Sequence, residues 1–225
     1  MRWFVVGLGS GCNLASNAGL PSSPDRPGGD HADADADTDA DADSDADADT
    51  DADTDTATGP TDTGGPCGSD GELVLSEVLD FGNLKFVELF NAGDGPVHLD
   101  DHTIEVYFNG STGGASVVNL PDEVLPKCTA YTVAYLRPDY VDAYGGPPDL
   151  VDDAIRGNGN DAYQLLGPDG VIDVYGEKGV DGLSEDWNYE DASARRVPSV
   201  RTGRKVWAVD QWSIESWTTA TPGIR

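Results

Sequence analysis

Short runs of apolar residues recur along the last two thirds of the chain and predict β-strands. The runs are rich in Val, Leu, Ile, Tyr and Phe, they are separated by Gly, Pro, Asp and Asn, and none has the 3.6-residue period of a helix. The predicted strands cover residues 72–79, 84–91, 96–99, 103–108, 115–120, 129–136, 162–166 and 171–175. Eight or nine strands in about 155 residues, with no intervening helix, predict an all-β fold, an antiparallel β-sandwich.

The first third of the chain has a different pattern, in which aspartate alternates with small residues. Every odd position from Asp33 to Asp55 is Asp, twelve in all, with Ala, Thr or Ser between them. A strand would place all twelve carboxylates on one face with no apolar face opposite, so burial could not offset the lost conformational entropy. We therefore expect a disordered, Asp/Ala/Thr-rich spacer over residues 13–66, which charge repulsion extends.

The strongly negative charge of the chain argues against one class of partner, nucleic acid. Lys and Arg number 13 against 42 Asp and Glu, a formal net charge of −29. Residues 1–66 hold 15 aspartates and two arginines, and residues 67–225 hold 27 acidic and 11 basic residues, so both parts are acidic. Nucleic acid is excluded as a partner, because its binding depends on basic side chains that displace counterions.

The aspartate tract also raises the question of calcium binding. Alternating aspartates resemble the start of an EF-hand loop, but no Gly occupies the sixth position and no Glu supplies the bidentate twelfth ligand. We expect no resident cofactor and only loose association of Ca²⁺ with the tract, and specific Ca²⁺ binding is the alternative.

Residues 1–12 have the features of an export signal. A positive charge at Arg2 precedes an apolar stretch and three small residues, which end at Cys12. Small residues before a Cys resemble the lipobox of bacterial lipoproteins, although Gly9 stands where an aliphatic residue is usual. The resemblance implies an exported outer-membrane or cell-surface lipoprotein, acylated at Cys12 and in contact with the membrane only through this anchor. Plain secretion and an ordinary cytoplasmic terminus are the alternatives.

Cys67 and Cys128 are the two remaining cysteines. In an exported chain two thiols most economically form one disulfide, which here would close a loop of about 60 residues and hold the first predicted strand in place. A metal-binding or catalytic thiol is the alternative, but neither cysteine belongs to a CxxC motif or has a histidine nearby in the sequence.

An ordered set of motifs runs through residues 72–225. They are 75–78 (LSEV), 85–91 (KFVELFN) with Gly93, 97–99 (VHL) followed by Asp101 and Ile104, 158–165, 167–173, Arg195 or Arg196, Trp212, and 220–223 (ATPG). In this order they resemble the lamin tail domain family. The resemblance implies an immunoglobulin-like β-sandwich in exported or surface-attached proteins, with a role in attachment and interaction. The chromatin association of the animal relatives is not carried over, because residues 67–225 are strongly acidic.

Two carboxylates inside apolar strands are the main catalytic candidates. Glu77 and Glu88 could face one open cleft and carry out glycoside hydrolysis. The alternative is structural, because a partly buried Glu must be paired to stay ionised, and Arg195 and Arg196 offer the counter-charges. We expect structural ion pairs and no catalytic residue.

Other polar candidates carry weaker signals. His98 and His102 have the spacing of a metal-binding pair, but a strand end followed by a strand start would not bring both rings to one face. We therefore expect no metal site. Ser76 and Ser193 lie outside any G-x-S-x-G motif.

Aromatic residues gather in the second half of the predicted sandwich. Trp187, Trp207 and Trp217 are candidate ligand-facing side chains, since rings beside acidic residues stack on sugars or grip proteins, and core packing is the alternative. We predict a non-catalytic interaction or structural module on an acidic stalk, with a protein or polysaccharide of the cell envelope or exterior as its partner. An accessory or weakly hydrolytic extracellular enzyme domain acting on polymers is the alternative.

Overall fold

The computed structural model describes residues 65–225. The predicted export signal, Cys12, the aspartate tract and nearly all of the predicted spacer lie outside the described residues. No helix within residues 65–225 is both long enough and apolar enough to cross a membrane.

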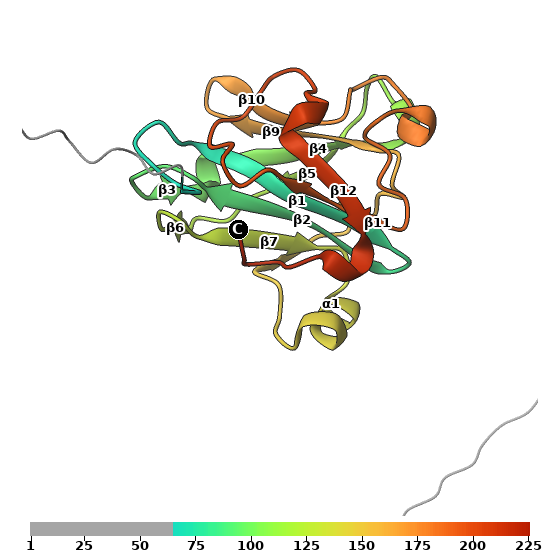
Figure 1. Cartoon of the computed structure of the whole chain (residues 1–225), viewed down its shortest axis with the longest axis horizontal. Coiled ribbons are helices and arrows are strands. Elements are labelled where there is room, and N and C mark those ends of the chain that lie inside the picture. The colour runs from blue at the N-terminus through green and yellow to red at the C-terminus, as the bar shows by residue number, and fades with distance from the viewer. Residues whose placement is uncertain (1–64) are drawn as a thin grey trace, which may run out of the picture. The chain divides into compact units, whose positions relative to one another are not determined.

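Twelve strands and one α-helix make up the regular structure of residues 65–225 (Figure 1). The strands are β1 (Leu73–Phe81), β2 (Leu84–Asn91), β3 (Val97–His98), β4 (Thr103–Tyr107), β5 (Ser116–Asn119), β6 (Val124–Leu125), β7 (Ala130–Ala134), β8 (Leu150–Val151), β9 (Ala162–Gly167), β10 (Gly170–Tyr175), β11 (Ala192–Arg196) and β12 (Trp212–Ser216). The α-helix is α1 (Arg137–Tyr144), and the short 3-10 helices are η1 (Leu99–Asp101), η2 (Phe108–Gly110), η3 (Gly182–Ser184), η4 (Val209–Gln211) and η5 (Trp217–Thr219).

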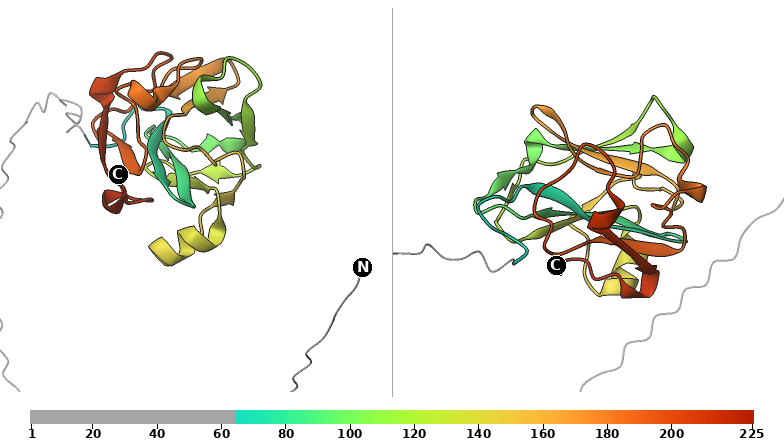
Figure 2. Two further views of the ribbon diagram at one scale, coloured as in Figure 1. Left: turned by 90° about the vertical axis from the view of Figure 1, so that its right-hand side faces the viewer. Right: turned by 45° about the horizontal axis from the view of Figure 1, so that its top comes forward.

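Two sheets form the layers of a sandwich (Figure 2). The larger sheet has the strand order β12-β11-β1-β2-β7-β8 and the smaller has β10-β9-β4-β5, while β3 and β6 form a separate two-stranded ribbon. Neighbouring strands are antiparallel except β7 and β8, which run parallel. The prediction of an all-β sandwich is confirmed.

The main hydrophobic core lies between the two sheets. Leu75, Val87 and Leu89 come from the larger sheet, Ile104 and Leu165 come from the smaller one, and all five are fully buried. Successive side chains of a strand point to opposite faces, so these residues lie on the inner side of their sheets while their neighbours in sequence face outward.

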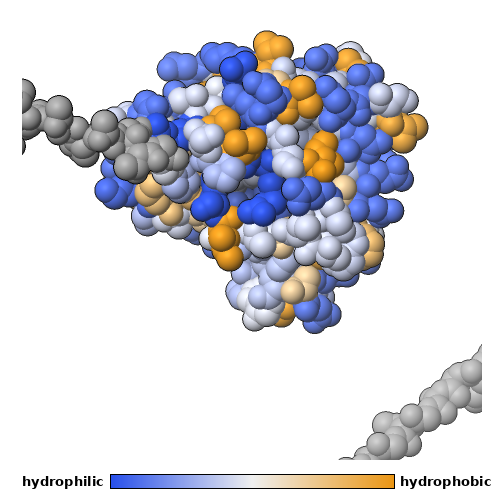
Figure 3. Space-filling view, viewed as in Figure 1, coloured by the Kyte–Doolittle hydropathy of each residue, from blue (hydrophilic) through white to orange (hydrophobic). Residues whose placement is uncertain are grey.

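The larger sheet is also covered on its outer face, so β1 is buried on both sides from Leu73 to Asp80. Leu79 and Phe86 form an outer apolar cluster with Tyr140 of α1 and Ala220 of the segment after β12. On the face seen in Figure 3 the surface is mainly polar, with apolar residues scattered among polar ones.

Helix α1 corrects the prediction that no helix interrupts the strands. It has Pro138 in its first turn and ends at Gly145, whose φ of +77° favours a residue without a Cβ atom. The helix has no apolar stripe, so its sequence shows no helical period. Its tyrosines instead hold it in place, because Tyr140 and Tyr144 pack edge-on against Phe86.

Strands β6, β8, β11 and β12 are also absent from the predicted set. Two of them, β6 and β8, are only two residues long. The sequences of β11 (ASARR) and β12 (WSIES) contain few large apolar residues. They are strands because they extend the edge of the larger sheet beside β1.

Cys67 and Cys128 form the expected disulfide, with their Cα atoms 5.7 Å apart. The bond joins the segment before β1 to the loop before β7. It therefore ties the start of the described chain to the sandwich.

Candidate functional site

A row of polar side chains crosses the outer face of the larger sheet. Strand register places Arg195 of β11 opposite Glu77 of β1, and Glu77 opposite Glu88 of β2. Like charges directly opposite each other on neighbouring strands are destabilising. The surroundings of the two glutamates must therefore compensate for their proximity.

A β-bulge in β1 sets the direction of Glu77. The register shifts between Leu75 and Glu77, and both Leu75 and Val78 then reach the main core while Glu77 lies on the outer side. The segment after β12 passes over this side, where Gly223 contacts Glu88. As a result, Glu77 is 2% exposed and Glu88 is 1% exposed.

Both carboxylate oxygens of Glu88 have internal hydrogen-bond donors. The hydroxyl of Ser76 donates to Oε1 at 2.6 Å, and the backbone N–H of Gly223 donates to Oε2 at 2.5 Å. Burial raises the pKa of Glu88, and these two hydrogen bonds oppose the rise. Ser76 thus serves as a partner of a buried carboxylate.

Glu77 also has partners within the molecule, among them the backbone of Thr221. The hydroxyl of Ser193 donates to its Oε1, while Nε of Arg195 lies 3.9 Å from its Oε2. Burial raises the pKa of Glu77 to about 7; the Ser193 hydrogen bond lowers it, the charge of Glu88 raises it and the charge of Arg195 lowers it. Glu77 therefore exchanges its proton near neutral pH.

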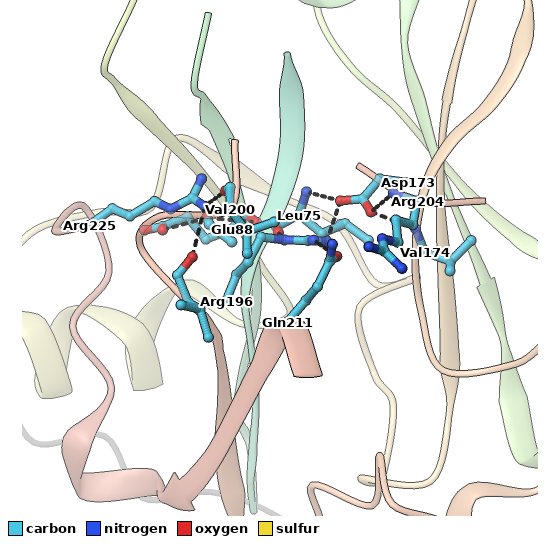
Figure 4. A network of polar contacts seen from close by, with 11 residues as sticks. Leu75, Glu88, Asp173, Val174, Arg196, Val200, Arg204, Gln211 and Arg225 are labelled. Carbon is cyan, nitrogen blue, oxygen red and sulfur yellow. Dashed lines mark hydrogen bonds and ion pairs between the residues drawn. The ribbon is translucent and has the colours of Figure 1, made fainter. Parts of the chain in front are cut away.

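Arg196 pairs with neither glutamate, which corrects the prediction. Arg195 faces the glutamate row, so the next residue of the strand faces the opposite side of the sheet. Its guanidinium binds Asp173 of β10 at 2.5 Å and donates to the backbone oxygen of Leu75 at 2.6 Å and to Oε1 of Gln211 at 2.7 Å (Figure 4). The Arg196–Asp173 pair is fully buried and joins the two sheets.

A small cavity of about 190 Å³ adjoins the glutamate pair. Besides Glu77 and Glu88, its lining includes Arg195, Ser213 and Arg225. Small-molecule sites usually have volumes of about 300–1,000 Å³, so this cavity is smaller than a typical ligand site. Two nearly inaccessible carboxylates next to a small cavity fit a structural role better than an open catalytic cleft.

Trp187 lies in the main core and is 3% exposed, so of the two alternatives given for this side chain core packing is the one observed. Two glycines make room for its ring. A Cβ atom at Gly182 would lie 2.4 Å from Nε1 of the indole, and one at Gly176 would lie 2.9 Å from it. The absence of side chains at these positions lets the ring sink into the sandwich.

Trp207 lies at the margin of the same aromatic group and is partly buried. Its ring packs against Tyr175 and Trp212, and its Nε1 donates to Oδ1 of Asp186 at 2.7 Å. The polar end of this side chain is therefore already satisfied within the molecule.

Trp217 borders a shallow groove of about 430 Å³, which we call the aromatic groove. It lies between the β1–β2 turn, α1 and η5 and is lined by Phe81, Gly82, Asn83, Leu84, Asp139, Asp142, Ala143 and Trp217. The rings of Phe81 and Trp217 stack with centroids 4.0 Å apart and planes inclined by 12°. Phe81 is 37% exposed, and the groove volume falls within the usual range for ligand sites.

Three polar side chains of the aromatic groove have no partner among residues 65–225. Asn83, Asp139 and Asp142 make no side-chain hydrogen bond or ion pair with any residue of 65–225, and none of the lining residues is basic. Their hydrogen-bonding groups are therefore available to a ligand.

The candidate metal ligands His98 and His102 contact each other through a backbone oxygen. Within residues 65–225 no three His, Cys, Asp or Glu side chains cluster as metal ligands. His102 instead makes a hydrogen bond through Nδ1 to the backbone oxygen of His98 at 2.9 Å.

No protein-family model matches the chain, and no match was found among curated proteins. The resemblance to the lamin tail domain family therefore stays a prediction from the motifs.

Proposed function

We propose that the protein is a non-catalytic interaction module that an acidic spacer displays outside the cell. The proposal rests on the contrast between the buried glutamates and the carboxylates that line the aromatic groove. Acid–base catalysis requires oxygens that can reach a substrate, and both oxygens of Glu88 are occupied by Ser76 and Gly223. A binding surface requires exposed aromatic area and free polar groups, and the aromatic groove has both.

The motif resemblance to lamin tail domains supports the same proposal. The motifs at residues 75–78 and 85–91 fall on β1 and β2, which are central strands of the larger sheet. Attachment and interaction, the role that this resemblance implies, need a stable scaffold with an exposed surface and no catalytic centre.

In this proposal the amino-terminal third of the chain anchors the sandwich to the membrane and holds it at a distance. Cys12 is the acylated anchor, and 55 positions separate it from Cys67. At roughly 3.3 Å per residue the spacer reaches at most about 180 Å, and repulsion between its aspartates favours long extensions. Incorporation of radioactive palmitate checks the anchor, and label that is undiminished in a Cys12→Ala variant contradicts it.

The proposed function is tested by measuring polysaccharide binding and polysaccharide hydrolysis on the same preparation of the full chain. With cellulose, chitin and isolated bacterial cell walls as probes, we expect saturable depletion of the protein from solution by at least one probe and no release of reducing ends. Glu77→Gln and Glu88→Gln variants that fold should bind as the natural chain does. Release of reducing ends that is lost in the Glu77→Gln variant overturns the proposal.

One observation favours a second candidate, a weakly hydrolytic domain acting on extracellular polymers. The pKa of Glu77 is about 7, which suits a general acid, and this side chain lines the small cavity. Hydrolysis by Glu77 would depend on pH around this value. A purely structural Glu77 leaves the reducing-end assay at background at every pH.

A further inference from the structure

We propose that the aromatic groove binds a polysaccharide chain whose sugars are neutral or carry a free amine. This inference rests on the proposed function, because it names the ligand of the interaction module. It is argued from the rings, the free polar groups, the charge and the strand arrangement around the groove.

The aromatic pair gives the groove a surface on which a sugar ring can stack. The face of an aromatic ring is negative, and the C–H groups on one side of a pyranose carry small positive charges, so the two faces attract and exclude water. Phe81 ends β1, and Gly82 follows it with a φ of +59°, which turns the chain sharply there. Trp217 is held in η5, where the hydroxyl of Ser216 accepts a hydrogen bond from the backbone N–H of Thr218.

Both rings are thus fixed before a ligand arrives. Trp217 packs against the outer apolar cluster that contains Ala220, and Phe81 stacks on Trp217. A preformed site loses little side-chain entropy on binding.

The free polar groups surround this pair on two sides. Asp139 and Asp142 are three residues apart on α1 and therefore lie on one side of the helix, while Asn83 lies in the β1–β2 turn. Carboxylates accept hydrogen bonds from hydroxyl groups, and the amide of Asn83 can both donate and accept. A sugar seated on the rings would offer hydroxyl groups along its edge to both sides.

The charge of the groove determines which sugars fit. Its two carboxylates are not accompanied by any Lys or Arg among the lining residues, so uronic acids and phosphate-bearing polymers are repelled. A protonated amine on the sugar would gain an ion pair with Asp139 or Asp142 and a favourable contact with an aromatic face. Neutral and amine-bearing sugars are therefore the expected ligands.

The strand arrangement disfavours a peptide as the occupant. A peptide commonly binds by adding a strand to a free sheet edge, but β1 and β2 each have a partner strand on both sides. A bound helix needs a long apolar groove, whereas the exposed apolar area here consists mainly of two rings flanked by carboxylates.

Titration of the full chain with short soluble sugars tests the inference. We use cellotetraose, chitotetraose, the tetramer of glucosamine and an alginate tetramer as probes in calorimetry at 0.15 M and 0.5 M NaCl. Affinity for a neutral tetramer, or for the glucosamine tetramer at both salt concentrations, together with no affinity for alginate, is the expected result. Binding of the alginate tetramer alone, or no binding of any tetramer, overturns it.

Matched variants locate the binding site. Phe81→Leu keeps an apolar side chain over Trp217 but removes the ring, and we expect it to bind the sugar tetramers roughly tenfold more weakly. Its control is Val151→Ala on exposed β8, which should leave the affinity unchanged. Asp139→Asn with Asp142→Asn should weaken the glucosamine tetramer more than chitotetraose. The control for this pair is Asp94→Asn with Asp153→Asn, which removes the same charge from elsewhere on the surface.

The outcomes separate the inference from the proposed function. Sugar binding with the natural affinity in Phe81→Leu overturns the groove as the site but leaves an interaction module in place. Binding of an oligolysine peptide that is lost in Phe81→Leu, without sugar binding, overturns the choice of ligand. Release of reducing ends that depends on Glu77 overturns the proposed function, but it does not affect the conclusion that the aromatic groove binds sugar.

Discussion

The buried glutamate pair and the aromatic groove both border the segment after β12, yet their carboxylates have opposite surroundings. Glu77 and Glu88 are at most 2% exposed and take hydrogen bonds from Ser193, Ser76 and Gly223. The carboxylates of the aromatic groove have no partner in residues 65–225. A buried charge is costly unless it is bonded, whereas an exposed one can remain free. The number of internal bonds therefore distinguishes carboxylates that support the fold from carboxylates that can meet a ligand.

Asp173 is the extreme case of a carboxylate that supports the fold. It accepts hydrogen bonds from the backbone N–H groups of Leu75 at 2.8 Å and of Val174 and Arg204 at 3.0 Å, in addition to its bond with Arg196 (Figure 4). These donors come from both sheets and from the loop before β12. One side chain thus satisfies polar groups from three parts of the sandwich.

The largest expected effect is that of Asp173→Asn. The substitution keeps the size of the side chain but leaves the buried guanidinium of Arg196 without a counter-charge, so we expect the free energy of unfolding to fall by about 3–5 kcal/mol. Urea unfolding followed by tryptophan fluorescence measures this change.

Asp153→Asn is the matched control for this prediction. Asp153 lies 3.9 Å from Arg156, and its side chain is 89% exposed, so its loss should cost less than about 1 kcal/mol. Equal effects of the two substitutions would remove the distinction between bonded and free carboxylates.

A second prediction concerns the pH dependence of stability at Glu77. Its pKa is about 7 in the folded protein and about 4.5 when unfolded, so between these values the folded state holds a proton that the unfolded state has lost. The free energy of unfolding should therefore fall as pH rises from 4.5 to 7, by about 3 kcal/mol from this group. Urea unfolding at pH 5 and pH 8 measures the fall.

Glu77→Gln isolates this contribution from the general charge repulsion of an acidic chain. The variant cannot ionise, so the difference in stability between it and the natural chain should grow in favour of the variant as pH rises from 5 to 8. A difference that does not change with pH would show that Glu77 is already ionised at pH 5, and the contrast with the exposed aspartates would weaken.

The strands of the core could be predicted because each is a short run of apolar residues bounded by turn residues. Leu75, Val87 and Leu89 lie in such runs, which identify a strand without knowledge of its neighbours. Strand β11 could not be found in this way, since the sequence ASARR becomes a strand only through pairing with β1. Helix α1 is likewise held by tyrosines that contact Phe86, a residue distant in sequence.

The candidate site could be predicted only in part, for a similar reason. The sequence pattern points to Glu77, Glu88 and Trp217, but it does not show which carboxylates are hydrogen-bonded. The predicted partners of Arg196 are the wrong carboxylates, because its actual partner Asp173 lies in the other sheet and only the alternation of β11 decides which side Arg196 faces. Asp142 is not among the predicted site residues, since nothing in the sequence places α1 beside the turn at Phe81.

The smallest expected effect is on the stability of the groove variants. Asp139 lies in the first turn of α1, where its charge interacts favourably with the helix N-terminus, and Asp142 lies near the other end, where the interaction is unfavourable. The double variant with Asn at both positions should therefore differ from the natural chain by no more than about 0.5 kcal/mol in its free energy of unfolding. Urea unfolding with the natural chain measured in parallel gives this value. A loss above about 1 kcal/mol would mean that these carboxylates support the fold as Glu88 does, and the aromatic groove would then lose its free polar groups.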